Sequence, residues 1–358
     1  MESAGKLAQR HNIAYLVHYG ALRCGVDKAS PAMEELFSLA VQGMIQKERQ
    51  DQAFAEIFAA FTADGIDFLP LKGLNLAKLY PKPEMRTMGD FDILIRQEQY
   101  DRIQKCMKTL GFSFVREYHH ELVWQRGSVS VELHRSLADT DDKAHAYFGD
   151  GWHLAKKGAD GTYRLSAEDE LVYLFYHFSK HYRGAGIGIK HLTDLWVYLK
   201  AHPQLEDGYV RRELDKLGLL RFYENVCKTL QAWFADGAWD PITERITEEI
   251  LSGGQYGTAS NRTSARILRA GAGDISGGRR KLVWKRIFLP YEDMKQRYPA
   301  LKRMPFLLPI FCVGRWGRIL VCKQREIRSF LRKDGGNSDA SLEQRRNSLK
   351  QVGLDGDF

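Results

Sequence analysis

The sequence predicts an α+β fold, in which a small sheet-containing core lies between N-terminal and C-terminal helical segments. Three observations support this prediction. Residues 31–65 carry apolar side chains at helical spacing, and residues 166–250 return to that spacing. Between them, residues 66–135 contain short apolar runs separated by glycine and proline, a pattern typical of short strands. We therefore expect the core to occupy the first half of the chain.

The N-terminal segment, residues 1–62, is expected to be helical. Leu36, Ala40 and Met44 repeat at helical spacing in its second half. Pro31 can stand in the first turn of a helix, and Gly65 can end one. These two residues therefore bound the longest predicted helix.

The core is expected at residues 63–150. Within "VSVELHR", Val129, Val131 and Leu133 alternate with polar residues, which is the period of a half-buried strand. The elements expected here are a strand at 66–73, a short helix at 74–80, a strand at 91–95, an amphipathic helix at 98–112 and strands around a turn at 113–135.

The remaining chain divides into a helical domain at 151–250, a linker and basic helical segment at 251–334, and a tail at 335–358. Helices are expected at 166–184, 191–202 and 210–234. The glycine-rich stretches 252–264 and 270–278 have the composition of flexible linkers. The polar tail is expected to be disordered.

The chain has 358 residues and a net charge of +8, but its charge is unevenly placed. Residues 261–358 contain 22 Lys and Arg against 9 acids, a net of +13, so residues 1–260 carry −5. A basic segment can attract nucleic acid or an anionic membrane surface. No aromatic-interleaved recognition motif accompanies it, so nucleic acid is the less favoured partner and a solvated basic face the simpler interpretation.

The cysteine pattern and the hydropathy favour a cytoplasmic protein. The five cysteines are scattered without a C-x-x-C pair, which argues against a disulfide framework or a zinc site. The N-terminus lacks the apolar run of a signal peptide, and no run reaches the length of a membrane span. The apolar and basic stretch "RMPFLLPIFCVGRWGRIL" is expected to pack on the protein's own core rather than on a membrane.

Two carboxylates stand out in "GDFDILI", residues 89–95. Asp90 and Asp92 are two positions apart in a predicted strand, so they share one face of it. Like charges at that spacing repel, and a bound divalent cation would remove the repulsion. Glu132 occupies a polar position of a strand that could pair beside 91–95. The three acids are therefore candidate ligands of Mg²⁺ or Mn²⁺ and candidate catalytic residues.

Three basic or small residues upstream are candidate phosphate ligands. Lys72 and Gly73 form a turn between a predicted strand and a predicted helix, where backbone N–H groups can meet phosphate oxygens. Arg86, four residues before Asp90, could neutralise charge on a triphosphate. His134 is placed to contact the nucleotide or to orient Glu132.

The order of "LKG", an arginine with "GDFDILI", and "VELH" resembles the DNA polymerase β-like nucleotidyltransferase superfamily, and within it the uncharacterised bacterial nucleotidyltransferase family. The similarity is good over 55–200. Where the superfamily has Gly-Ser or Gly-Gly, this chain has Lys72-Gly73, so Lys72 would replace a serine–phosphate contact. The third acid is Glu132, where Asp is commoner.

This resemblance implies a small mixed-sheet nucleotidyltransferase core and transfer of an NMP group from an NTP, such as ATP, to an acceptor hydroxyl, with release of pyrophosphate. It implies that Asp90, Asp92 and Glu132 hold two Mg²⁺ ions, and that Glu132 helps to deprotonate the nucleophile. The alternative is an inactive nucleotide-binding or partner-binding module on the same fold. The sequence specifies neither the acceptor nor the oligomeric state.

Other candidate sites are weaker. His177 and His181 lie four apart on one helix but lack the glutamate of H-E-x-x-H, so helix packing is favoured over zinc. "GAGIG" (184–188) does not follow a strand and does not predict a dinucleotide site. Asp194 lies among apolar residues and needs a partner, for which Lys180, His181 and Lys190 are candidates. Asp194 could instead help to hold the acceptor, but we expect its role to be structural.

Overall fold

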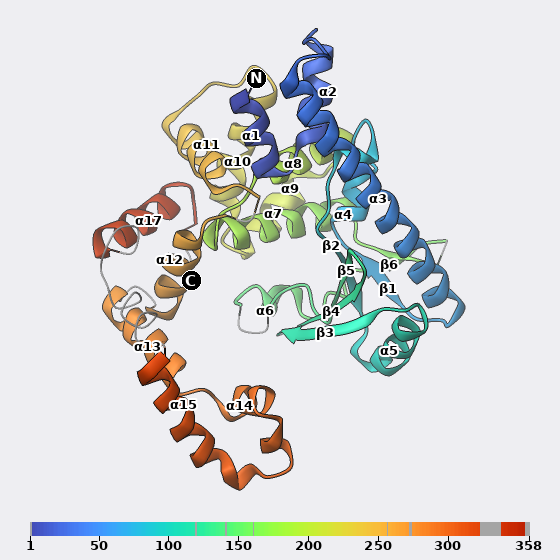
Figure 1. The fold of residues 1–358 in the computed structure, drawn as a ribbon. Coiled ribbons are helices and arrows are strands. Elements are labelled where there is room, and N and C mark those ends of the chain that lie inside the picture. The colour runs from blue at the N-terminus through green and yellow to red at the C-terminus, as the bar shows by residue number, and fades with distance from the viewer. Residues whose placement is uncertain are drawn as a thin grey trace. The chain divides into compact units, whose positions relative to one another are not determined.

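The computed structural model describes residues 2–118, 120–139, 142–159, 161–255, 257–271, 274–322 and 338–354 (Figure 1). The chain forms two compact units. The first comprises residues 1–180 and 187–255, and the second comprises residues 181–186 and 256–358. The candidate site residues Lys72, Gly73, Arg86, Asp90, Asp92, Glu132 and His134 all belong to the first unit.

The first unit surrounds a small sheet with helices. The longer helices are α1 (Glu2–His11), α2 (Ala14–Arg23), α3 (Pro31–Ala63), α5 (Tyr100–Thr109), α7 (Ala167–Arg183), α8 (Ile189–Ala201), α9 (Asp207–Lys216), α10 (Leu220–Phe234) and α11 (Pro241–Gly253). The shorter ones are α4 (Gly73–Ala77), α6 (His145–Phe148) and the 3₁₀ turns η1 (Pro83–Met85) and η2 (Gln97–Gln99). The last residues of α7 fall in the second unit.

The sheet has five strands in the order β1-β2-β5-β4-β3. They are β1 (Phe68–Pro70), β2 (Asp90–Ile95), β3 (Ser113–Tyr118), β4 (Glu121–Arg126) and β5 (Val129–His134). β2 runs parallel to β5, and the other neighbours are antiparallel. The fold is therefore α+β with a mixed sheet, and the expected pairing of the "VSVELH" strand beside 91–95 is confirmed. A two-residue ribbon, β6 (Lys156–Lys157) and β7 (Tyr163–Arg164), is separate from this sheet.

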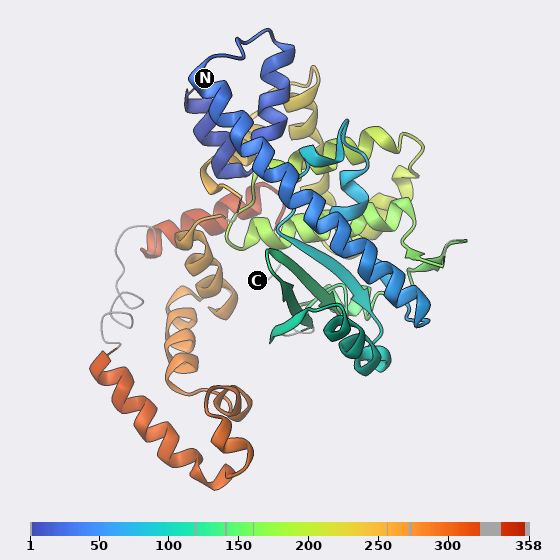
Figure 2. The same cartoon turned by 45° about the vertical axis from the view of Figure 1, so that its right-hand side comes forward.

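One face of the sheet is apolar and forms the main core of the unit. Phe91, Ile93 and Ile95 of β2 lie on this face, together with alternate residues of β5 and β4 such as Val131 and Leu122. Helices α3 and α5 cover this face, as Figures 1 and 2 show. Since successive residues of a strand point to opposite faces, the polar residues of the same strands are directed away from this core.

Several boundaries of the first unit follow the expected signals. Pro31 occupies the first turn of α3, and Gly65 follows that helix with a φ of 59°. Gly111 follows α5 with a φ of 79°. The Ser166 hydroxyl accepts a hydrogen bond from the Asp169 N–H (3.0 Å), as expected of an N-cap before α7.

The second unit is helical, and it differs from the sequence-based expectation. It contains α12 (Ala259–Gly271), α13 (Ile275–Ile287), α14 (Tyr291–Arg297), α15 (Leu308–Cys322), α17 (Asp339–Gln351) and the 3₁₀ turns η3 (Pro299–Lys302) and η4 (Pro305–Leu307). Much of the linkers expected at 252–264 and 270–278 is helix. Residues 256, 272 and 273 lie outside the described residues.

The tail expected to be disordered at 335–358 contains helix α17. Leu342 and Leu349, seven residues apart, are buried, and Leu342 packs with Ile267 and Leu268 of α12. Ser338 caps α17 by accepting a hydrogen bond from the Ser341 N–H (3.1 Å). An apolar stripe two turns long is enough to dock a polar helix on a neighbour. Residues 335–337 and 355–358 lie outside the described residues.

The segment "RMPFLLPIFCVGRWGRIL" does not pack fully on the core, contrary to expectation. Arg315 and Ile319 are buried, but Phe306, Ile310 and Val313 are all more than 60% exposed. None of the helices in the described part of the chain combines the length and the apolar character needed to cross a bilayer.

The packing of α3 on the apolar face predicts the cost of truncating that core. Phe91 is 1% exposed, and its ring lies 5.8 Å from that of Phe54. Phe91→Ala should lower the free energy of unfolding by about 3–5 kcal/mol in a urea titration. Phe37→Ala is the matched control, because Phe37 lies on the same helix α3 as Phe54 and is 54% exposed. It should cost less than about 1 kcal/mol. Equal costs for the two variants would contradict this assignment of the core.

Candidate active site

The parallel pairing of β2 with β5 places two carboxylates side by side. Asp92 is the direct partner of Glu132 in the register, and Asp90 is the partner of Ser130. Neighbouring strands lie about 4.8 Å apart, and paired residues point to the same face. Asp90, Asp92 and Glu132 therefore all lie on the polar face of the sheet, opposite the core packed by α3 and α5.

Asp92 is held by two cationic or hydrogen-bonding partners. Lys72 Nζ lies 3.5 Å from Asp92 Oδ1, and His134 Nε2 lies 2.8 Å from the same oxygen. Burial would raise the pKa of Asp92, but Lys72 and His134 more than offset it and hold that pKa well below its ordinary value. Asp92 is thus an ionised carboxylate at neutral pH.

For Glu132 the compensation is weaker, because the charge of Lys72 lowers its pKa by less than burial and the neighbouring carboxylates raise it. Burial, followed by the charges of Asp90 and Asp92, raises the pKa of Glu132 to about 8. The nearest histidine nitrogen, His134 Nε2, is 4.0 Å from Glu132 Oε2. Two carboxylates in direct register, one ionised and one inclined to keep its proton, show that this face lacks positive charge.

The donor set fits a hard divalent cation. One ligand atom from each of Asp92, Glu132 and His134 lies within 4.8 Å of the others. Asp90 is exposed at the start of β2, the strand that carries Asp92. Carboxylate oxygens are the ligands that Mg²⁺ and Mn²⁺ prefer. The raised pKa of Glu132 has the direction expected where a cation would supply the missing charge.

The turn between β1 and α4 brings Lys72 to this face. Lys72 has a φ of 46°, a left-handed conformation that is uncommon for a residue with a side chain. Its Nζ lies near Asp92 and 5.5 Å from the centre of the Tyr173 ring of α7. Burial would lower the pKa of Lys72, but Asp92 and Tyr173 raise it above its ordinary value, so Lys72 is charged.

Gly73 is needed for close packing rather than for its backbone angles. A Cβ atom at this position would lie 2.8 Å from Met88 Sδ and 3.0 Å from Arg86 Nη1. The Gly73 carbonyl also accepts a hydrogen bond from Arg86 Nη1 (3.3 Å). The glycine therefore lets the turn of Lys72 lie against the arginine that precedes β2.

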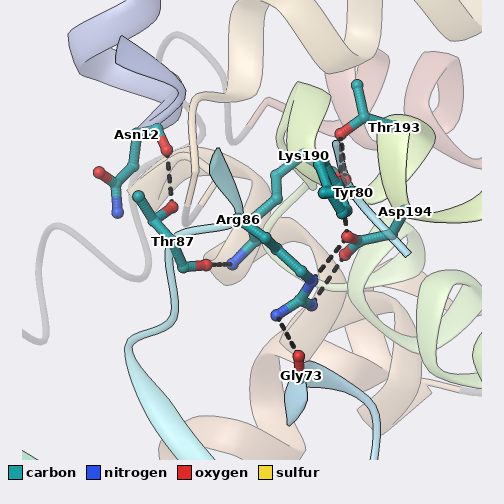
Figure 3. Close-up of polar contacts among 8 residues, drawn as sticks. All are labelled: Asn12, Gly73, Tyr80, Arg86, Thr87, Lys190, Thr193 and Asp194. Carbon is teal, nitrogen blue, oxygen red and sulfur yellow. Dashed lines mark hydrogen bonds and ion pairs between the residues drawn. The ribbon is translucent and has the colours of Figure 1, made fainter. Parts of the chain in front are cut away.

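Arg86 is engaged with Asp194 of α8 in a bidentate ion pair (Figure 3). Arg86 Nε lies 2.7 Å from Asp194 Oδ1, and Nη2 lies 2.9 Å from Oδ2. Tyr80 donates its hydroxyl proton to the same carboxylate (2.8 Å). Both charged residues are buried. These contacts give Arg86 a different task from the expected triphosphate contact, since all three guanidinium nitrogens already have partners within the protein.

Asp194 thus has a structural partner, as expected, but the partner is Arg86 and not Lys180, His181 or Lys190. Lys190 instead donates to the Thr87 carbonyl (3.3 Å). The Thr87 hydroxyl in turn donates to the Asn12 carbonyl (2.7 Å), as Figure 3 shows. The segment that enters β2 is therefore fixed both to α8 and to the N-terminal helices.

Lys190 was not identified as a site residue from the sequence. Burial, followed by the charge of Arg86, lowers the pKa of Lys190 to about 8, while Asp194, Asp90 and Asp92 act in the opposite direction. Glu121, Tyr173 and His120 were also missed. Glu121 directly precedes Leu122, a core residue of β4, so it lies on the opposite face, but the consecutive apolar residues Leu122 and Val123 interrupt the polar–apolar alternation there.

A small mixed sheet that presents adjacent carboxylates from two parallel strands, beside a lysine–glycine turn, is the core of a nucleotidyltransferase. The chain belongs to the family described as uncharacterised nucleotidyltransferase, whose model matches residues 2–235. No curated protein matches the chain.

Solved structures give weaker similarities. A solution structure of the antibiotic-resistance factor ANT(2″)-Ia is 13% identical, with a TM-score of 0.37, covering 48% of this chain and 91% of that one. A crystal structure of ANT(2″)-Ia with adenylyl-2″-tobramycin is also 13% identical, with a TM-score of 0.36, covering 46% and 94%. An antigenic nucleotidyltransferase-like protein from Paracoccidioides brasiliensis, again 13% identical, gives a TM-score of 0.30, covering 52% and 94%.

The buried ion pair predicts a strong and non-additive effect on stability. Arg86→Ala leaves the Asp194 carboxylate buried without its cation and should cost about 3–5 kcal/mol of unfolding free energy. The double variant Arg86→Met/Asp194→Leu should lose clearly less unfolding free energy than the sum of the losses measured for Arg86→Met alone and Asp194→Leu alone. Urea unfolding followed by circular dichroism measures both.

The control for that cycle is the exposed pair Arg212–Glu206, whose nitrogen and oxygen are 3.4 Å apart. Arg212→Ala should cost at most about 1 kcal/mol. An Arg86→Ala variant as stable as the control would contradict the positioning role of the pair.

The raised pKa of Glu132 predicts a pH-dependent gain from removing its charge. Below about pH 4.5, the ordinary pKa, both folded and unfolded chains hold the proton; between 4.5 and 8 only the folded chain does, so stability falls as pH rises. In EDTA, Glu132→Gln should therefore be more stable than wild type at pH 9, on the order of 1–3 kcal/mol, and similar at pH 5.

Thermal unfolding at both pH values measures this difference. Glu98→Gln, at an exposed position of the same unit, should show no pH-dependent gain. A Glu132→Gln variant that is less stable than wild type at pH 9 would refute the charge repulsion inferred at this face.

Proposed function

We propose that this chain transfers an NMP group from an NTP, ATP being the first candidate, to a hydroxyl-bearing acceptor, with release of pyrophosphate. The observation that carries the proposal is the direct register of Asp92 with Glu132 on parallel strands. A pair of like charges in this position is costly unless a cation joins them. Membership of the nucleotidyltransferase family supports the same reaction class.

Asp90, Asp92 and Glu132 would hold Mg²⁺ or Mn²⁺. When bound, the cation neutralises charge on the triphosphate and favours attack at the α-phosphorus. The carboxylates come from two strands of one sheet, so their separation is fixed by the backbone register rather than by loops.

Lys72 is proposed to contact Asp92 when the site is empty and the NTP phosphates when a cation is bound. Its Nζ now compensates the charge of Asp92 from 3.5 Å. A cation held by Asp92 would supply that charge instead, and Lys72, beside Gly73, would then be able to contact the phosphate groups of the NTP. Lys190 adds a second positive charge near Asp90.

Glu132 is the proposed general base. It is a carboxylate fixed by strand register beside Asp92, and a positioned carboxylate can accept the proton of an attacking hydroxyl. In the transfer step the acceptor hydroxyl gives its proton to a Glu132 carboxylate oxygen, and the acceptor oxygen forms a bond to the α-phosphorus. The bond from that phosphorus to the bridging oxygen breaks, and pyrophosphate leaves.

The remaining residues position this machinery. His134, expected to touch the nucleotide or to orient Glu132, contacts Asp92 most closely and is proposed to orient that carboxylate. Arg86 and Asp194 join the Gly73 turn to α8. The acceptor is defined only by its chemistry: it bears a hydroxyl that can reach Glu132.

Calorimetry with each of the four NTPs, with and without Mg²⁺, tests the binding half of the proposal. Wild type should bind at least one NTP only when Mg²⁺ is present. Asp92→Asn, which keeps the shape of the side chain, should weaken that binding at least about 10-fold. With an acceptor in hand, Glu132→Gln should lower the transfer rate by at least about 10²-fold.

Asp101→Asn is the control, because Asp101 is an exposed acid in the first turn of α5. It should bind like wild type. Mg²⁺-dependent binding without transfer to any hydroxyl acceptor would support the inactive nucleotide-binding module instead. A folded wild type that binds no NTP under any metal condition would overturn the proposal.

A further inference from the structure

The polar face of the sheet continues beyond the carboxylates assigned above. Glu121 of β4 is the direct partner of His134 in the register, and the buried His120 precedes it. The ring centres of His120 and His134 lie 5.5 Å apart. One ligand atom from each of His120, Glu121 and His134 lies within 4.8 Å of the other two. Two imidazoles and a carboxylate therefore converge at one point.

Asp139 determines which nitrogen of His120 is available. Asp139 Oδ1 lies 2.8 Å from His120 Nδ1, and its other oxygen lies 2.9 Å from Lys180 Nζ. The contact has the distance of an ion pair but not the alignment of a hydrogen bond, and the negative charge of Asp139 favours the tautomer with the proton on Nδ1, which leaves the lone pair on Nε2. A carboxylate behind one ring nitrogen is the usual partner of a histidine that binds a metal through the other.

The distance between His120 Nε2 and Glu121 Oε1 suits a cation bound between these two atoms. His120 Nε2 lies 3.8 Å from Glu121 Oε1. That is longer than a hydrogen bond of about 2.7–3.2 Å. It is close to the span of two metal–ligand bonds of about 2.0–2.2 Å each. The lone pair of His120 thus faces an anionic oxygen across a gap that a divalent cation would fill.

We propose that His120, Glu121 and His134 bind a divalent cation of the borderline transition-metal class, which Zn²⁺ represents. Two imidazole nitrogens and one carboxylate oxygen suit that class, whereas the oxygen-rich set of Asp90, Asp92 and Glu132 suits Mg²⁺. This second site stands on its own geometry and does not require nucleotidyl transfer.

The shared residue gives the second cation a consequence for the first site. His134 Nε2 also lies 2.8 Å from Asp92 Oδ1. A cation bound to His134 fixes the imidazole that contacts Asp92. The histidine site therefore positions one of the carboxylates on which the proposed reaction depends.

Co²⁺ titration of the full chain without a polyhistidine tag tests the site. Metal-stripped protein is titrated with Co²⁺ and followed by the visible absorption of the bound ion, and Zn²⁺ is then added as competitor. Wild type should saturate at one high-affinity equivalent, which Zn²⁺ displaces. His120→Ala should lose that equivalent. Asp139→Asn should bind about 10–100-fold more weakly, because it removes the carboxylate beside His120 Nδ1 and leaves all three proposed ligands in place.

His153→Ala is the matched control, because His153 is an exposed histidine of the same unit, and it should titrate like wild type. Mg²⁺-dependent ATP binding of metal-stripped wild type, with no Co²⁺ or Zn²⁺ present, tests the proposed function by itself, so failure of this site and failure of the proposed function are separable. If His120→Ala does not fold, Glu121→Gln replaces it and should weaken Co²⁺ binding at least about 10-fold. Saturable binding that is equal in wild type, His120→Ala and Glu121→Gln would overturn the site, as would absence of saturable binding to wild type.

Discussion

The repulsion between Asp92 and Glu132 across two parallel strands is the constraint on which the rest of the site depends. Their register is set by backbone hydrogen bonds, so neither side chain can move to the other face of the sheet. The apolar residues that alternate with them pack against α3 and α5, and that core fixes the register. The stability of one face thus holds an electrostatically unfavourable arrangement on the other.

The two carboxyl groups differ in their tendency to ionise. Asp92 remains ionised because Lys72 and His134 surround it, whereas Glu132 is left with burial and like charges and tends to keep its proton. Lys72 reaches Asp92 from a turn with an unusual backbone angle, and Arg86 ties that turn to α8. Local strain, a buried ion pair and a perturbed carboxyl occur together, as is common where a site is organised for a ligand.

Much of this face could be predicted from the sequence, because its signal is local. The spacing of Asp90 and Asp92 and the alternation around Glu132 are enough to place all three acids on strand faces. Contacts between distant segments could not be predicted in this way. Arg86 and Asp194 are 108 residues apart, and no local pattern distinguishes a paired arginine from one that binds phosphate.

Helix α17 and the position of His120 were not predicted from the sequence for similar reasons. Helix α17 lies in a polar stretch, and its two buried leucines, Leu342 and Leu349, become informative only once a neighbouring helix is known. His120 precedes a strand, where alternation no longer defines its direction, so its approach to Glu121 and Asp139 depends on the turn it occupies. Composition and period describe regular elements well and describe their junctions poorly.

The central claim is that a cation, when bound, removes the repulsion between Asp92 and Glu132. The most direct measurement is the thermal unfolding midpoint of wild type and Glu132→Gln at pH 8.5 as Mg²⁺ or Mn²⁺ is added. The account predicts that the cation raises the midpoint of wild type more than that of the variant, and removes the advantage that the variant has in EDTA. Equal shifts in the two proteins, or no shift in wild type, would contradict it.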